Sequence, residues 1–526
     1  MSFQCSSRHN KKRINVPNHN QDKKILASAF SEFKQVVGNE WASNTEESRK
    51  QYIDDYNPGN PLEFISGGYV APASTSEVQE VVKIANTYKV PIWPLSTGKN
   101  LAYGGAAPRE QGGIMLDLKR MNKIIEVDED LAYAVVEPGV SFFDMYNYLQ
   151  ANNHKLWMSV PGPGWGSLIG NGLERGVGYG YYSDHFGSSC GMEVVLPDGD
   201  LLRTGMGAMN NNSSWHLFNY GFGASVDSLF TQSNYGIVTR MGRNLLPEPE
   251  FYMSCEILCK NDSDLESIVD VVRPFKLDET IRNPVVISNA EIIASFMSVR
   301  KQWYQGEGPI PENTLDEMAR KLNLGRWNAS FALYGDEAKV QNAWKRIQNA
   351  AKHIKGVEFV ARTYEPGDKI IHPRDQSQAG IPSLNEFSLV NWRGAGGHID
   401  FSPVGPMRAK DARKMNDMVR GRIHEYGFDH LGGFYCDARA FRCVNTLVFQ
   451  KDSPAEMAKI RKLFGVLVDD FSREGYGEYR THLAYMDQVA KTYDFNNNAM
   501  LRFQKQLKSA IDPQGIIAPG KSGVWS

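Results

Sequence analysis

A segment near the end of the sequence, Gly515–Ser522, has the spacing GxxxxGK[ST] of a nucleotide-binding phosphate loop. That motif binds phosphate because it opens a helix, whose N-terminal amides and dipole hold the anion. Only four residues follow Ser522, too few for that helix, and Pro519 removes one amide from the loop. We therefore expect no ATPase and predict that the segment packs as a C-terminal tail. The glycines at 176, 178 and 180 also lack the GxGxxG spacing of a Rossmann dinucleotide site.

A second glycine-rich segment, Pro94–Gly105, could hold a diphosphate group by a different geometry. It follows a buried-strand pattern and combines the hydroxyls of Ser96 and Thr97 with glycines at 98, 104 and 105. Small residues of this kind let consecutive backbone N–H groups converge on an anion, an arrangement called a nest. An ordinary turn between a strand and a helix has the same composition, so this segment alone favours neither interpretation.

The surrounding elements would place that segment at the end of a strand. Residues 68–95 are typical of a strand–helix–strand unit: a short apolar run, a helix cap at Ser74, then apolar residues at 78, 81, 82 and 85 with helical spacing. The unit ends in the apolar residues 90–95. Further strands are predicted over 113–118, 124–127 and 132–137.

The chain is long enough for two domains, because 526 residues exceed what one hydrophobic core usually organises. Glycine clusters dominate residues 160–240, whereas residues 247–476 alternate strands with charged amphipathic helices, predicted over 312–322, 338–355 and 454–474. Residues 477–526 are again rich in glycine. We predict an α+β protein in which residues 1–246 and 477–526 form one domain and residues 247–476 form a second, inserted domain.

Composition argues against several classes of partner. The formal net charge is −2, with 41% hydrophobic and 22% charged residues, so nothing in it indicates nucleic acid or an anionic membrane. No stretch approaches the roughly 18 apolar residues of a membrane span, and the N-terminus lacks a signal sequence. The six cysteines form no CxxC pair, so we predict neither a metal site nor a disulfide framework. We expect an intracellular, cytoplasmic protein with a flexible tail over residues 1–25 and no peroxisomal signal.

Blocks of the sequence from about residue 65 onward resemble, in order, those of the vanillyl-alcohol oxidase and eugenol oxidase family of flavoproteins. The matching blocks are Pro94–Gly105, Gly166–Asn171, Glu174–Tyr179, Gly191–Leu196, Gln232–Thr239, Leu322–Asn328, Gly396–Pro403, Gly477–Ala484 and Gly515–Trp525. The resemblance implies a two-domain fold with a discontinuous FAD-binding domain of the p-cresol methylhydroxylase type (1–246 and 477–526). The inserted domain (247–476) would be a cap that covers the flavin ring and shapes the substrate cavity.

FAD is therefore the expected cofactor, and the resemblance implies which residues bind it. His398 matches the histidine that is bonded to the 8α-methyl group of the flavin in the family. The other expected contacts all lie in or beside the matched blocks: Pro94, Ser96, Thr97, Gly98, Lys99, Asn100, Gly104, Gly105, Gly162, Ser167, Gly170, Asn171, Glu174, Gly178, Tyr179, Gly236, Ile237, Val238, Arg480 and Lys521.

Tyr103, Tyr479 and Arg480 match the family's phenolate-binding set. A phenol has a pKa of about 10, and a guanidinium with two hydroxyl donors favours its ionised form. The resemblance implies that the phenolate then releases a hydride from its benzylic carbon to flavin N5 and becomes a quinone methide. Adjacent strand residues point to opposite faces, so Tyr479 and Arg480 can both face the substrate only where the backbone twists or bulges.

The expected substrates are para-substituted phenols of the vanillyl alcohol, eugenol or 4-alkylphenol type, with O₂ as electron acceptor and H₂O₂ as product. Tyr435, Asp437 and His482 are expected in the substrate cavity, and Glu386 and Arg374 are expected to orient other groups. The resemblance also implies a homodimer or a larger homo-oligomer.

Two features depart from the family. Relatives have an aspartate beside flavin N5 where this chain has Gly162, and they have a histidine that activates the linking one, whereas residues 50–65 contain none. These departures leave open the covalent bond to FAD and the identity of the proton acceptor. Asp400 shares a predicted strand face with His398 and is our first candidate for the missing carboxylate. Asp437 is the second, and the alternative for Asp400 is a buried, paired side chain without a catalytic role.

Two other functions are compatible with these residues. A dehydrogenase on the same fold would pass its electrons to a cytochrome. Relatives of that kind link the flavin through a tyrosine, so the presence of His398 disfavours this function. A flavin-binding protein that has lost catalysis would account for Gly162, but the presence of Tyr103, Tyr479 and Arg480 argues against it.

Overall fold

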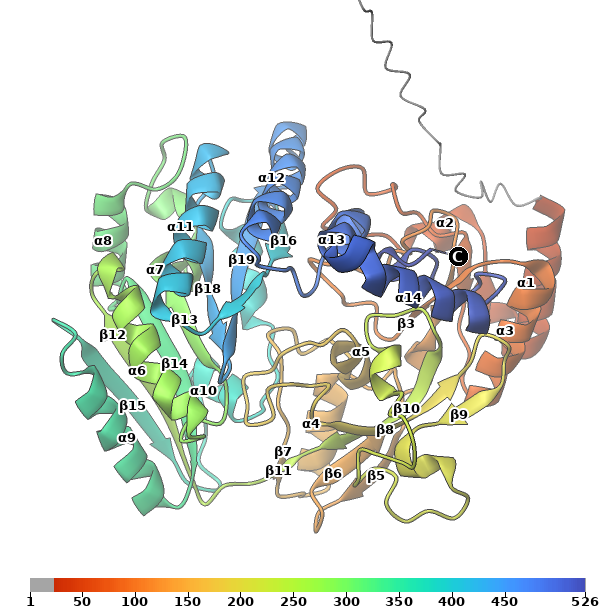
Figure 1. Ribbon diagram of the computed structural model, residues 1–526, viewed down its shortest axis with the longest axis horizontal. Coiled ribbons are helices and arrows are strands. Elements are labelled where there is room, and N and C mark those ends of the chain that lie inside the picture. Colours follow the sequence, from red (N-terminus) through yellow and green to blue (C-terminus); the bar gives the residue numbers. More distant parts are fainter. Residues whose placement is uncertain (1–22, 526) are drawn as a thin grey trace, which may run out of the picture.

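A computed structural model describes residues 23–525 of the chain (Figure 1). The expected flexible tail lies outside this range except for its last residues, which begin helix α1 (Lys23–Val37). Figure 1 shows two lobes side by side, one built from the N-terminal and C-terminal segments and the other from the middle of the chain. Within the described range, no helix is both long and apolar enough to cross a membrane.

The first lobe begins with a four-stranded sheet. Helix α3 (Thr75–Tyr88) connects two of its strands and begins where the hydroxyl of Ser74 accepts a hydrogen bond from Glu77 N at 3.2 Å. The predicted strand–helix–strand unit is confirmed, and it ends at Leu95, directly before loop 96–105. The strands, in sheet order, are β1 (Ala42–Ser43), β2 (Gly68–Val70), β4 (Ile114–Asp117) and β3 (Ile92–Leu95), with β2 and β3 parallel to β4.

A five-stranded antiparallel sheet completes the N-terminal part of this lobe. Helices α4 (Phe142–Ala151) and α5 (Leu168–Leu173) pack against it through an apolar cluster that includes Met145, Leu168 and Val194. The short strands β7 (Leu156–Trp157) and β11 (Leu246–Pro247) pair with each other where the chain leaves the lobe. The strands of the large sheet, in order, are β5 (Ile124–Asp128), β6 (Tyr133–Val136), β10 (Ile237–Asn244), β8 (Ser189–Val195) and β9 (Leu201–Arg203).

The C-terminal segment returns to the first lobe through helices α13 (Met486–Thr492) and α14 (Phe495–Ile511). Its tail then pairs with β3: Ile92 N donates to Ile516 O at 2.8 Å, and Ala518 N donates to Ile92 O at 2.8 Å. The segment that mimics a phosphate loop therefore extends the edge of the first sheet and ends in the short 3-10 helix η9 (Lys521–Gly523). It packs as a tail, as the sequence predicts.

The second lobe is built on an eight-stranded antiparallel sheet. Its main helices are α6 (Leu265–Leu277), α8 (Glu312–Lys321), α9 (Glu337–Ala351), α11 (Ala409–Glu425) and α12 (Pro454–Arg473), which confirm the three amphipathic helices predicted here. The strands, in sheet order, are β15 (Glu358–Tyr364), β12 (Phe251–Cys259), β14 (Trp327–Gly335), β13 (Val285–Asn289), β18 (Leu431–Cys436), β19 (Ala440–Gln450) and β16 (Gly396–Phe401), and β17 (Val404–Pro406) also pairs with β19.

The two faces of this sheet have different partners because side chains alternate along each strand. One face packs against α6, α9, α11 and α12 in the largest apolar cluster, to which β16 contributes Ile399 and Phe401 and β18 contributes Phe434. The residues between them, such as His398 on β16 and Tyr435 on β18, point the other way, toward the first lobe. The second lobe is therefore an α+β unit whose helices cover one face of the sheet, while the other face is turned toward the first lobe.

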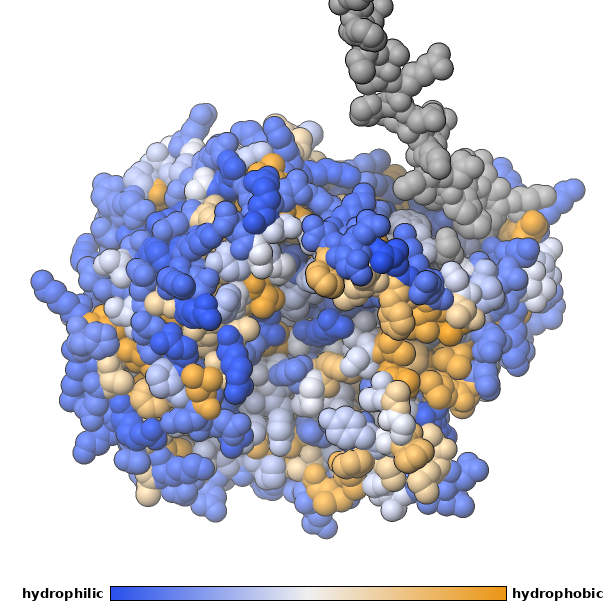
Figure 2. All heavy atoms as spheres, in the orientation of Figure 1, coloured by the Kyte–Doolittle hydropathy of each residue, from blue (hydrophilic) through white to orange (hydrophobic). Residues whose placement is uncertain are grey.

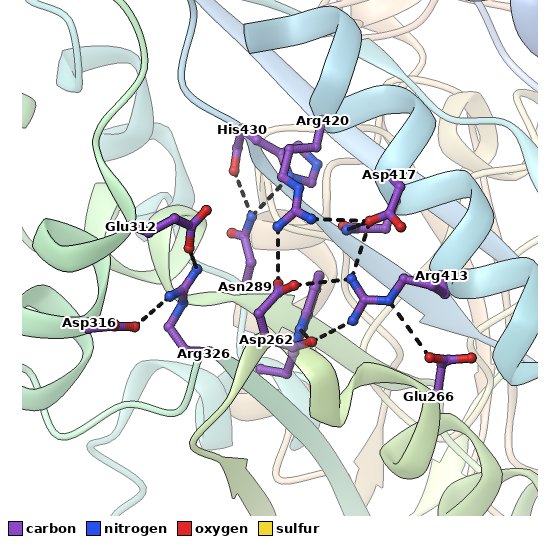
Figure 3. Close-up of polar contacts among 12 residues, drawn as sticks. Asp262, Glu266, Asn289, Glu312, Asp316, Arg326, Arg413, Asp417, Arg420 and His430 are labelled. Carbon is purple, nitrogen blue, oxygen red and sulfur yellow. Dashed lines mark hydrogen bonds and ion pairs between the residues drawn. The ribbon is translucent and has the colours of Figure 1, made fainter.

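Charged side chains also connect the helices of the second lobe, here called the cap, to each other and to its sheet (Figure 3). Asp262, before α6, accepts hydrogen bonds from Arg413 at 3.1 Å and from Arg420 at 3.2 Å, both on α11. Arg326, before β14, pairs with Glu312 at 2.6 Å on α8. Ion pairs with exposed partners contribute about 1 kcal/mol or less each, so the apolar cluster is the main source of the cap's stability.

Candidate active site

A cavity of about 390 Å³ lies where the two lobes meet. The first lobe lines it with loop 94–105, with the segment 161–179 and with parts of residues 230–238 and 518–521. The cap lines it with alternate residues of β13, β16 and β19, with consecutive residues of β18, and with side chains outside the sheet such as Glu386. Segments that are hundreds of residues apart in the sequence therefore share one cavity.

The wall formed by the first lobe has the features expected of a diphosphate site. Gly98, Gly104 and Gly105 have φ angles of +67°, +118° and +57°, a backbone region that L side chains rarely adopt. A Cβ atom on Gly170 would lie 2.4 Å from Ser96 Oγ, so α5 approaches the loop closely. The predicted FAD contacts that line the cavity are Pro94, Ser96, Thr97, Gly98, Lys99, Asn100, Gly104, Gly105, Gly162, Ser167, Gly170, Asn171, Glu174, Tyr179, Gly236, Ile237, Val238, His398, Arg480 and Lys521.

Three predicted site residues lie outside the lining of this cavity. Gly178 packs against a histidine, because a Cβ atom there would lie 2.3 Å from His185 Nε2. Asp437 pairs with Arg442 at 2.7 Å. His482 is fully buried, and its Nε2 lies 2.6 Å from Asp54 Oδ2.

An ion pair connects the C-terminal tail to the wall of the cavity. Lys521 Nζ bonds to the carboxylate of Glu174, and Ser522 Oγ donates to Gln232 O at 2.5 Å. Burial alone would raise the pKa of Glu174, but Lys521 and Arg480 hold it below its usual range. Glu174 is therefore ionised at neutral pH, and its charge offsets part of the positive charge of the cavity.

The three residues expected to bind a phenolate converge at the cavity. The guanidinium carbon of Arg480 lies 4.1 Å from the ring centroid of Tyr103, and Nη2 of Arg480 bonds to Asn100 Oδ1. Tyr479 and Arg480 lie in a bend rather than in a strand, which is why both adjacent side chains reach the cavity. The buried Nε of Arg480 has no hydrogen-bond partner among residues 23–525 and can donate to a ligand.

The hydroxyl groups beside Arg480 stay protonated. Burial raises the pKa of Tyr103 well above its usual value, and the charge of Asp400 raises it further. Burial also raises the pKa of Tyr479, although Arg442 and Arg480 partly oppose this effect. Both tyrosines can therefore donate a hydrogen bond to an anionic oxygen.

His398 and Asp400 form a pair on the cavity side of β16. His398 Nδ1 lies 3.2 Å from Asp400 Oδ1, and the ring of Tyr56 lies 5.2 Å from the imidazole ring. The other ring nitrogen, Nε2, is buried and has no hydrogen-bond partner in the described part of the chain. A buried nitrogen of this kind fits a histidine that meets a bound cofactor.

The lining also contains a residue that no motif in the sequence singles out. Arg442 lies on β19, with its guanidinium carbon 5.7 Å from the ring centroid of Tyr479. Its only sequence signal is strand alternation with Val444 and Thr446, which also line the cavity. Glu386 and Arg374, expected in orienting roles, line the cavity as well and lie 3.8 Å apart.

Comparisons with known proteins agree with this geometry. Residues 67–205 match the family described as FAD binding domain, and residues 409–522 match the family described as FAD linked oxidases, C-terminal domain. The class of protein is therefore that of the FAD-linked oxidoreductases, and FAD is the cofactor.

More similar proteins define the family within that class. The flavoprotein subunit of 4-cresol dehydrogenase [hydroxylating] from Pseudomonas putida is 38% identical over 86% of this chain and 87% of its own. The structures of 4-ethylphenol oxidase from Gulosibacter chungangensis and of p-cresol methylhydroxylase each superpose with a TM-score of 0.92, at 34% and 36% identity, over 96% of this chain and 98% of theirs. The chain belongs to this p-cresol methylhydroxylase-like family, which confirms the resemblance, the fold class and FAD.

The close packing of loop 94–105 predicts that a single methyl group abolishes FAD binding. A Cβ atom on Gly104 would lie 2.3 Å from Leu483 Cγ, at a φ of +118°. We expect Gly104→Ala to retain less than about a tenth of the wild-type FAD per chain, measured by flavin absorbance after gel filtration, because a clash of this size shifts the loop. Gly112→Ala is the control, since Gly112 also has a positive φ of +87° but open space around it. Equal FAD content in the two variants would contradict the role of this loop.

Proposed function

We propose that this chain oxidises para-substituted phenols. The observation that carries the proposal is the convergence of Arg480, Tyr103 and Tyr479 at a cavity that also contains His398. The names of similar proteins support this substrate class, because they refer to 4-cresol and 4-ethylphenol. When bound, FAD supplies the hydride acceptor, which amino-acid side chains do not provide.

The residues around Arg480 would bind the substrate as its phenolate. The substrate phenol has a pKa of about 10 in water, and an adjacent guanidinium lowers it. Tyr103 and Tyr479 keep their protons because burial raises their pKa values, so both remain donors to the ring oxygen. Electron density from that oxygen then favours loss of hydride from the para side chain.

Removing the charge of Arg480 should weaken phenol binding. Hydrogen bonds to charged groups contribute about 1.5–3 kcal/mol, so we expect Arg480→Met to bind unsubstituted phenol about 10- to 100-fold more weakly. Unsubstituted phenol has no benzylic carbon, so binding can be followed by the flavin absorbance spectrum without turnover. Arg473→Met is the control, because Arg473 is exposed on α12. Unchanged affinity in Arg480→Met would refute the phenolate site.

We propose that O₂ accepts the electrons and yields H₂O₂, which makes the chain an oxidase. The likeness to 4-ethylphenol oxidase supports this acceptor. The second candidate is a dehydrogenase that passes electrons to a cytochrome, and the likeness to 4-cresol dehydrogenase favours it. A third candidate, a flavin-binding protein without catalysis, would account for Gly162.

One experiment separates these candidates. Protein reduced under nitrogen with 4-ethylphenol should regain its flavin absorbance within seconds of exposure to air, with one H₂O₂ formed per flavin. A dehydrogenase would stay reduced in air for minutes and regain its absorbance when cytochrome c is added. A protein that has lost catalysis would not be reduced by the phenol at all.

We further propose that FAD is bonded covalently to His398, with Asp400 as the group that prepares the histidine. A carboxylate 3.2 Å from Nδ1 holds the tautomer in which Nδ1 carries the proton. Nε2 then has a free lone pair, and it is the atom that lacks a partner among the described residues. This pairing would replace the activating histidine that is missing from residues 50–65.

The linkage predicts how acid separates flavin from protein. After acid precipitation we expect the wild-type pellet to be yellow, the His398→Ala supernatant to be yellow, and Asp400→Asn to release about half of its flavin or more. Asp437→Asn is the control, since Asp437 lies outside the cavity lining. Complete linkage in Asp400→Asn would rule out its role toward His398. Asp400→Asn also tests the role of Asp400 as proton acceptor, which the sequence predicts. If 4-hydroxybenzyl alcohol reduces the flavin of this variant at a near-normal rate, Asp400 is not the proton acceptor.

The surface of the first lobe supports self-association. Figure 2 shows hydrophobic side chains gathered on its visible face. On α14, Phe495 is 85% exposed and Phe503 is 63% exposed. Contiguous exposed apolar surface of this kind often marks a contact between proteins, so we propose that the chain forms a homodimer or a larger homo-oligomer.

A further inference from the structure

A second guanidinium lies in the part of the cavity that contains Tyr479. Arg442 is on β19, directly opposite Tyr435 of β18 in the register of the sheet. Its neighbours Phe441 and Cys443 belong to the apolar cluster of the cap. Because side chains alternate along a strand, Arg442 faces the cavity, and its guanidinium carbon lies over the ring of Tyr479 at 5.7 Å from the centroid.

An ion pair fixes the orientation of this guanidinium. Nη2 of Arg442 donates to Asp437 Oδ2 at 2.7 Å. Asp437 lies in the turn between β18 and β19, where its backbone N donates to Ala440 O at 2.9 Å. Burial raises the pKa of Asp437, and the charges of Arg442 and then of Lys276 oppose this effect. A carboxylate on a tight turn therefore holds the guanidinium against Tyr479.

Each tyrosine of the expected phenolate site thus has a guanidinium over its ring. Arg480 lies 4.1 Å from the centroid of Tyr103, and Arg442 lies 5.7 Å from that of Tyr479. A cation over an aromatic face is attracted to the ring and restricts its position. Burial raises the pKa of Tyr479, and Arg442 opposes this effect more than Arg480 does. A hydroxyl whose proton is more acidic is the stronger donor to an anion.

We propose that Arg442 is a positioning residue, which fixes the ring of Tyr479 and strengthens its hydroxyl as a hydrogen-bond donor to the bound phenolate. This inference rests on the proposed oxidation of phenols. Arg442 acts through Tyr479 and does not itself have to touch the substrate. The same arrangement gives Asp437 a role outside the cavity lining, as the group that anchors Arg442.

The other charged and titratable groups near Tyr479 leave this effect to Arg442. Burial raises the pKa of Glu478 well above its usual range, so this carboxyl is protonated at neutral pH. Asp400 on β16 opposes both arginines, but its carboxylate lies 3.2 Å from His398 Nδ1. Burial keeps the remaining neighbours neutral, and these are Tyr103 and Tyr435. Removing Arg442 therefore alters Tyr479 while Arg480 stays in place.

The pH dependence of phenol binding tests the proposal. Affinity for unsubstituted phenol, followed by the flavin absorbance spectrum, should be constant below the pKa of the bound phenol and rise with pH above it, because only then is a proton released on binding. We expect Arg442→Met to bind phenol as well as the wild type on the constant part. Where the affinity rises, it should bind about 3- to 10-fold more weakly, which moves the bend up by about half to one pH unit.

Matched variants decide the outcome. Arg439→Met, which removes an exposed arginine from the same turn, should leave the curve unchanged. In a Tyr479→Phe background, Arg442→Met should change phenol affinity by less than about twofold, because the hydroxyl on which it acts is absent. If Arg442→Met does not retain FAD, Arg442→Gln replaces it in every measurement, since glutamine can still donate to Asp437.

Two results would overturn the proposal. One is a loss of affinity that is equal at all pH values, which would mean that Arg442 supports the packing of the cavity alone. The other is an equal loss with and without the hydroxyl of Tyr479, which would mean that Arg442 does not act through that group. If the wild type binds FAD but no phenol at any pH, the proposed function has failed instead.

Discussion

The alternation of side chains along the strands of the cap sheet is the constraint on which the whole site depends. Successive residues point to opposite faces, so one face of the sheet can be an apolar core while the other forms a cavity wall. On β16, Ile399 and Phe401 pack among the cap helices, which fixes the strand. His398 and Asp400 must then face the first lobe. The rigidity of the core thus orients the polar residues without contacting them.

A second requirement is electrostatic. The cavity contains several cationic side chains, and charged groups away from water need partners. Glu174 is such a partner for Lys521, and the pair also fastens the C-terminal tail to the wall. Arg480 keeps one buried donor unpaired among the described residues, which suits a group that must bind an anionic ligand. Burial keeps Tyr103 and Tyr479 neutral beside it, so the positive charge is not cancelled by the protein itself.

Gly162 has no side chain, and the space beside it is filled by Glu386 from the other lobe. A glycine in one lobe opens a space of side-chain size, and a glutamate from the other lobe fills it, 2.0 Å from where a Cβ atom would lie. Tyr179 of the first lobe donates its hydroxyl hydrogen to this glutamate. The backbone oxygen of Tyr179 in turn accepts a hydrogen bond from Asn283 Nδ2 of the cap at 2.9 Å. The two lobes are therefore complementary in shape at this point.

The sequence by itself determined the family, the cofactor and the strand–helix–strand unit before loop 94–105, because glycines, helix caps and apolar periodicity act over a few residues. It also indicated that His398 and Asp400 share a face, since strand period is a local property. Only the tertiary structure decided the rest. The bend at Tyr479 and Arg480, the withdrawal of His482 to Asp54, and the meeting of Gly162 with Glu386 all depend on contacts between segments far apart in the chain. Such contacts are set by the packing of one lobe against the other, which no short stretch of residues encodes.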